Sequence, residues 1–131
     1  MPSAFITSRA DVEILGKVMT KDDISEIESH MGIEGNYYAA AIEKKNFLLD
    51  LIKKSGVFAV NFSSIKNSAQ TRADGRYLDK FSKLGIPKKE AEKINCPIIG
   101  GADSFECALD RIIDMGERAI IIGSIIKKHK V

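Results

Sequence analysis

The fold class is decided by residues 105–128, which read FECALDRIIDMGERAIIIGSIIKK. Residues 105–114 and 119–128 alternate or run apolar, and the second of these segments is rich in isoleucine. Isoleucine is β-branched, which favours strands over helices. The residues between the segments include Gly116, so the pattern predicts a β-hairpin with a glycine-containing turn over 115–118.

Three further apolar runs lie upstream of the hairpin. Residues 4–8, 37–42 and 57–62 are short, apolar and bounded by polar residues, and each is expected to be a strand. Between the last two, residues 46–54 place apolar side chains on one face and end in two lysines. This spacing predicts an amphipathic helix that ends at Ser55-Gly56.

Further helices are expected in the polar parts of the chain. Thr20 can cap a helix over residues 22–30, which would carry two aspartates in its first turn, where the helix dipole favours acidic side chains. Residues 77–84 and 87–93 are expected to form two short helices. Strands nevertheless dominate and no regular βαβ alternation is present, so the predicted fold class is mainly β, an antiparallel barrel with helical insertions.

The composition is that of one ordinary globular domain, expected to span residues 1–131. The chain has 20 Lys and Arg against 18 Asp and Glu, a net charge of +2, which is too small to indicate a nucleic-acid partner. No apolar run reaches the roughly 18 residues needed to cross a bilayer, and the first residues lack a signal-peptide pattern. We therefore expect a cytoplasmic protein that binds neither nucleic acid nor membrane. Cys96 and Cys107 form no CxxC pair, and no metal is expected.

No short catalytic motif is present: the sequence has no GxGxxG, Walker loop, GxSxG or HExxH. Two basic segments remain as candidates. Lys44-Lys45 falls between a strand and a helix start, where backbone N–H groups favour an anion, although it can equally be an exposed loop pair. Arg72, Arg76 and Lys80 lie around Gly75 in a loop that can wrap an anionic ligand or form a solvated surface.

Several stretches, in order along the chain, resemble motifs of the flavin reductase-like family. LIKKSGVFAVNF at 51–62 is similar to the family's "ELI..SGEFVVN" helix and strand. DGRYLDKF at 74–81 resembles "SGRDVDKF", and FECAL at 105–109 resembles "ALECRV". GERAIIIGSII at 116–126 resembles "GDHTLFVGEVV". Four such matches in register identify the chain as resembling this family.

The resemblance implies an FMN-binding split β-barrel with Greek-key topology that forms a homodimer and holds FMN near the subunit interface. It implies an oxidoreductase or electron-transfer protein that uses FMN, with NAD(P)H or a redox partner protein as a further partner. By motif, Lys80 is expected on the surface as an FMN or substrate contact, and Lys45 and Asn46 near the phosphate. Thr20 ends a match to the family's "NVMT" strand along the flavin ring, and Arg118 stands where many members carry His.

The chain departs from the family at residues 20–36. Members have a Ser-Trp and a Pro-rich loop there, whereas this chain has no Trp and carries an acidic segment that is expected to be helical. Its carboxylates would oppose a phosphate dianion. Two hypotheses follow: an FMN-dependent oxidoreductase or electron carrier, and a non-catalytic split-barrel homologue with a degraded flavin site that acts as a binding or structural dimer.

Overall fold

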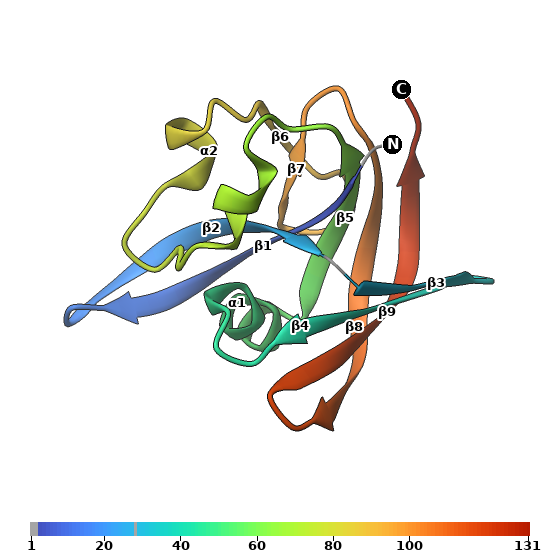
Figure 1. The fold of residues 1–131 in the computed structure, drawn as a ribbon, viewed down its shortest axis with the longest axis horizontal. Coiled ribbons are helices and arrows are strands. Elements are labelled where there is room, and N and C mark those ends of the chain that lie inside the picture. Colours follow the sequence, from blue (N-terminus) through green and yellow to red (C-terminus); the bar gives the residue numbers. More distant parts are fainter. Residues whose placement is uncertain (1–2, 28) are drawn as a thin grey trace.

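A computed structural model describes residues 3–27 and 29–131. Most of the strands form one curled antiparallel sheet in the order β2-β1-β5-β8-β9-β4-β3 (Figure 1). The bounds of these strands in chain order are β1 Ser3–Ile14, β2 Lys17–Ile27, β3 Ser29–Glu34, β4 Tyr37–Glu43, β5 Val57–Ser63, β8 Asp103–Met115 and β9 Arg118–His129. A small second sheet pairs β6 Lys88–Glu90 with β7 Pro97–Ile99. The helices are α1 Phe47–Ser55, the 3₁₀ helix η1 Ser68–Arg72 and α2 Lys80–Lys83.

The hairpin expected from residues 105–128 is confirmed and is longer than predicted. Strands β8 and β9 pair in antiparallel fashion from Ser104 and His129 to Met115 and Arg118. Gly116 sits in the turn with φ +83°, a left-handed conformation that glycine adopts without steric cost. The three strands expected upstream are also present, as β1, β4 and β5. The mainly β fold class is therefore confirmed.

The helix expected over residues 46–54 is also confirmed, as α1, which lies against the sheet (Figure 1). Asn46 caps it, because its Oδ1 accepts a hydrogen bond from the backbone N–H of Leu48 at 3.0 Å. Leu48 and Ile52 are fully buried in the main core, where they join side chains of β1, β4, β5 and β9. Phe47 and Leu51 pack on a separate cluster with the far end of β1. The start of α1 is therefore fixed both by the Asn46 cap and by the packing of the helix's apolar side chains.

The helix expected over residues 22–30 is wrong, because this segment is extended and belongs to β2 and β3, with Glu28 outside the described residues. Apolar residues at 24, 27 and 31 have the spacing of one helical face, but Ile24 and Ile27 do not share a face here. In the strand they point to opposite faces, since side chains alternate, and they pack into two different clusters. Asp23 and Ser25 are buried as well, so this end of β2 is covered on both faces. A strand buried on both sides loses the alternation that identifies strands in a sequence.

The two short helices expected further along are only partly present. Of residues 77–84, only Lys80–Lys83 is helical, as α2, capped by Asp79. The helix expected over 87–93 is wrong: Lys88–Glu90 forms the edge strand β6, whose side chains are all exposed. No buried face supports a helix there. No helix within the described parts of the chain has the length and apolarity needed to span a bilayer.

Candidate functional site

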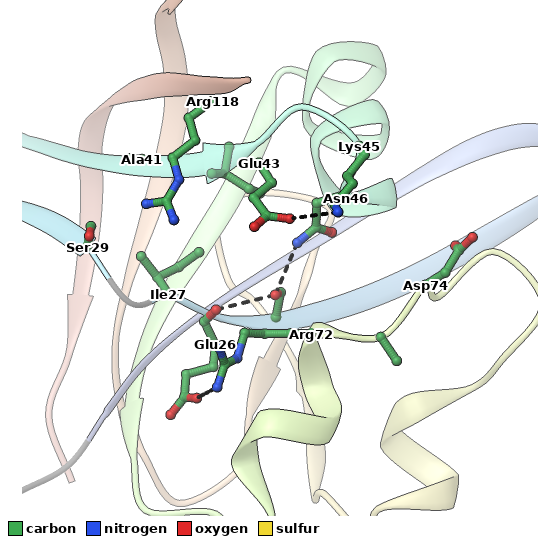
Figure 2. Close-up of a pocket in the computed structure, with 13 residues that line it drawn as sticks. Glu26, Ile27, Ser29, Ala41, Glu43, Lys45, Asn46, Arg72, Asp74 and Arg118 are labelled. Carbon is green, nitrogen blue, oxygen red and sulfur yellow. Dashed lines mark hydrogen bonds and ion pairs between the residues drawn. The ribbon is translucent and has the colours of Figure 1, made fainter. Parts of the chain in front are cut away.

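The first candidate site is a pocket of about 490 Å³ where the curled sheet fails to close. Strands β2 and β3 are the two edges of the sheet, and the pocket lies between β2 on one side and β3 and β4 on the other (Figure 2). The start of α1 and the segment after η1 complete the wall. The lining residues are Ser25, Glu26, Ile27, Ser29, Ala41, Ile42, Glu43, Lys45, Asn46, Arg72, Ala73, Asp74 and Arg118.

Asn46 joins two walls of this pocket. Its Oδ1 caps α1, while its Nδ2 donates to the Oγ of Ser25 on β2 at 3.2 Å (Figure 2). The backbone N–H of Asn46 donates to the carbonyl of Glu43 at 3.0 Å, which tightens the turn between β4 and α1. The helix N-terminus therefore faces the pocket at a fixed distance from β2.

Arg118 supplies the pocket with a cation that has no counter-ion among the residues that the structure describes. It is the first residue of β9 and pairs with Glu43 of β4 in the sheet register. Within residues 3–27 and 29–131, its guanidinium has neither a hydrogen bond nor an ion pair. Figure 2 shows the guanidinium pointing away from β9 toward Ile27 on β2. Because an arginine is charged at any physiological pH, this position attracts an anion.

The carboxylates in the pocket wall all have cationic partners. Glu26 lies 3.4 Å from Arg72, Glu43 lies 3.9 Å from Lys45, and Asp74 lies 3.3 Å from Arg76. The unmatched charge among these described lining residues is therefore positive and belongs to Arg118. Of the acidic residues in 20–36 that were expected to oppose a phosphate, Glu26 has its charge matched by Arg72. For the rest of that segment, which includes Glu28 outside the described residues, the expectation stays a prediction.

Asp22 does not line the pocket and instead takes part in a separate network of ion pairs. Its carboxylate lies 2.6 Å from Nε of Arg9 and 2.9 Å from Nζ of Lys88. Burial by itself would raise the pKa of Asp22, but the hydrogen bonds from Arg9 and Lys88 outweigh it and hold this pKa below its ordinary value. Arg9 also binds Glu90 of β6, so the cluster links the small sheet to β1 and β2.

The structure brings together three of the five residues expected to contact a cofactor. Lys45, Asn46 and Arg118 all line the pocket. Thr20 does not: it is exposed on β2, where its Oγ1 donates to Oδ1 of Asp11 at 2.6 Å, and it caps no helix. The expectation of a surface side chain at Lys80 is wrong, because its ammonium is fully buried beside Asp23.

Sequence reasoning missed Ser25 and Ser29, which offer hydroxyl groups to the pocket. Both lie in the segment that was expected to be helical, so their faces could not be assigned. Arg72, which by sequence alone can be either a ligand contact or a solvated residue, lines the pocket.

A second cluster contains Glu92, Glu106 and His129, whose potential ligand atoms all lie within 4.8 Å of one another. The carboxylate of Glu106 is already occupied. It accepts hydrogen bonds from the backbone N–H groups of residues 92, 93 and 94 and contacts Nε2 of His129. Burial would raise the pKa of Glu106, but these hydrogen bonds together hold it below its ordinary value. The cluster therefore acts as a link between a loop and the sheet.

Comparison with known proteins identifies the class. Residues 30–130 match the flavin reductase like domain, so the chain belongs to the flavin reductase-like family. The sequence matches no curated protein. The fold is the flavin reductase-like split barrel.

Three solved structures share this fold over essentially the whole chain. Flavoredoxin from Methanosarcina acetivorans superposes with a TM-score of 0.78 at 18% identity, covering 100% of this chain and 69% of its own. The NADH:FAD oxidoreductase of Streptomyces globisporus, in complex with NAD and FAD fragments, gives 0.75 at 18% identity, with coverages of 100% and 76%. An FMN-binding protein from Thermus thermophilus with bound 1-cyclohex-2-enone gives 0.75 at 17% identity, with coverages of 99% and 71%.

Proposed function

We propose that the pocket between β2 and β4 binds FMN, and that the protein acts as a flavin-dependent oxidoreductase or electron-transfer protein. The observation that carries the proposal is the guanidinium of Arg118 at the pocket wall, which has no ion-pair partner in the described part of the chain. Volumes of about 300–1,000 Å³ are typical of cofactor sites, and the pocket of about 490 Å³ lies within that range. Membership of the flavin reductase-like family supports a flavin as the ligand.

The residues present fit an anionic cofactor that also carries hydroxyl and carbonyl groups. Arg118 and Lys45 would hold the phosphate, together with the N-terminus of α1. The hydroxyl of Ser29 would donate to the polar groups of the ligand, and Ile27 and Ile42 give the pocket apolar walls. The flavin, when bound, supplies the capacity to take up and release electrons. The protein positions it and balances its charge.

A nicotinamide cofactor is the proposed electron donor. The Streptomyces globisporus relative is an NADH:FAD oxidoreductase, and the pocket here is lined in part by exposed residues, among them Ser29, Lys45 and Asp74, so a second ligand can approach it. A redox partner protein remains the alternative donor or acceptor within the same proposal.

We also propose that the protein is a homodimer. Both long hairpins end in exposed apolar side chains: Leu15 is 85% exposed and Val18 74% at the β1–β2 end, and Met115 is 58% exposed at the β8–β9 end. The β1–β2 hairpin projects beyond the rest of the molecule (Figure 1). Exposed apolar side chains on projecting hairpins are typical of protein interfaces.

The experiment is a fluorescence titration of FMN with two matched arginine variants. Arg118→Ala removes the unpaired cation and should weaken FMN binding by about ten- to a hundredfold, since a charge-assisted hydrogen bond contributes about 1.5–3 kcal/mol. Arg111→Ala lies on the same hairpin, outside the pocket, and pairs only with neighbouring Asp110 among the described residues. It should bind as the parent protein does. Absence of FMN binding by the parent protein would overturn the proposal and favour a degraded site.

A further inference from the structure

One wall of the pocket consists of residues 72–74, which have no apolar packing to hold them. Arg72 ends η1, and Ala73 and Asp74 follow in irregular chain. All three are exposed. An exposed irregular segment is normally among the more mobile parts of a protein. Something other than burial of these side chains must therefore set its position.

The residue before this wall is anchored by Lys80. Its ammonium donates to the carbonyl of Thr71 at 2.6 Å and to the carbonyl of Ile24 at 2.9 Å, and it lies 2.9 Å from Oδ1 of Asp23. Two of these contacts are hydrogen bonds and the third is an ion pair, so oxygen atoms surround the ammonium. Thr71 is attached to β2 a second time, because its Oγ1 accepts from the backbone N–H of Glu26 at 2.8 Å.

The residue after the wall is held against the same ion pair. Gly75 is buried, and a Cβ built on it would lie 2.2 Å from Oδ1 of Asp23. The three atoms nearest to that Cβ all belong to the Asp23 carboxylate. No residue with a side chain can occupy this position without displacing the loop or Asp23. Both ends of the wall therefore converge on the Asp23–Lys80 pair.

Stability is a poor explanation for this pair. Neither side chain has any exposed surface, and removing two charges from water costs more than their attraction commonly returns. In agreement, burial raises the pKa of the Asp23 carboxyl even though Lys80 opposes the rise. An ion pair that costs free energy to bury but joins specific atoms is better suited to holding the loop of residues 72–74 in one place.

We propose that Asp23 and Lys80 are positioning residues, which fix residues 72–74 as the outer wall of the pocket through Thr71 on one side and Gly75 on the other. The proposal rests on the proposed function for the identity of the ligand. Lys80 thus acts on the ligand through the loop and does not touch it.

The test compares two glycine variants. Gly75→Ala places a methyl group against Asp23 and should weaken FMN binding by about tenfold, the lower end of the roughly 10–100-fold loss seen in metal sites when a residue that orients a ligand group is removed. Gly100→Ala is the matched control, because the nearest atom to its Cβ would be Cβ of Pro87 at 3.5 Å, an ordinary van der Waals contact. It should bind FMN as the parent protein does. Unchanged FMN affinity in Gly75→Ala overturns the proposal.

A rescue experiment separates positioning from general loss of stability. In an Asp23→Ala/Lys80→Met background the carboxylate is gone, so adding Gly75→Ala should cause no further loss of FMN affinity. The visible absorption band of bound FMN should be displaced in both Gly75→Ala and the double variant at saturating FMN. If Gly75→Ala weakens binding equally in both backgrounds, the clash lies elsewhere and the proposal is wrong.

Amide hydrogen exchange measured without ligand distinguishes failure of the positioning role from failure of the proposed function. Gly75→Ala should accelerate exchange over residues 71–76 and leave β8 and β9 unchanged. If the parent protein binds no FMN but this acceleration is seen, the proposed function fails and the positioning role stands. If exchange over 71–76 is unchanged, the positioning role fails whatever the ligand.

Discussion

At the residue scale, Lys80 and Arg118 carry the same charge but have different roles, because their surroundings differ. Lys80 is buried with three oxygen acceptors around its ammonium, and nothing of its charge is available to a ligand. Arg118 lies at the pocket wall without a partner in the described part of the chain. Affinity for an anion should therefore depend directly on Arg118, and on Lys80 only through the loop that it holds.

Lys80→Ala should accordingly destabilise the protein. It leaves the buried carboxylate of Asp23 without a counter-ion, which typically costs about 3–5 kcal/mol. Lys83→Ala, in the same short helix but exposed, should change stability by less than about 0.5 kcal/mol. Urea unfolding measures both. A Lys80→Ala variant as stable as Lys83→Ala would show that the pair is not buried as described.

Glu106 shows at the scale of elements how a loop is attached to the sheet. Its carboxylate sits on β8, accepts from the backbone of residues 92–94 and contacts His129 on β9. Its pKa is lowered in the folded state. Stability from this group is therefore complete above the unfolded pKa of about 4.3 and is lost as the pH falls through the lower folded value.

Glu106→Gln should destabilise the protein by about 2 kcal/mol at neutral pH, because it removes charge-assisted hydrogen bonds to the backbone N–H groups of residues 92–94. The difference from the parent protein should shrink below about pH 4, where the carboxylate itself becomes protonated. Denaturant unfolding from neutral pH down to pH 3 checks this. A difference that does not depend on pH would mean that the carboxylate charge contributes nothing.

Elements whose buried side chains are mostly apolar could be predicted from the sequence, and the strand that buries several polar side chains could not. The β8–β9 hairpin and α1 each show their apolar spacing plainly. Strand β2 does not, because Asp23 and Ser25 are buried along with Ile24. The candidate site could likewise be predicted only in part. Arg118, Lys45 and Asn46 follow strand ends and a helix start, which local sequence reveals, whereas burial of Lys80 depends on Asp23, far away along the chain.

At the scale of the whole molecule, the curled sheet leaves exposed apolar hairpin ends and an open pocket. A second copy of the chain that covers the hairpin ends would explain both the exposed apolar side chains and the open pocket. Light scattering should give roughly twice the chain mass of 14.4 kDa at micromolar concentration. Replacing Leu15 and Val18 together by serine should lower that mass, whereas exposed Lys66→Ser should not. A mass near 14.4 kDa for the parent protein would exclude the dimer.

A crystal structure of the protein grown with FMN would show whether a flavin occupies the pocket between β2 and β4. We expect electron density for the flavin in this pocket, with its phosphate in contact with Arg118 and close to the N-terminus of α1. Flavin density at another face of the molecule, or an empty pocket at saturating FMN, would contradict this expectation.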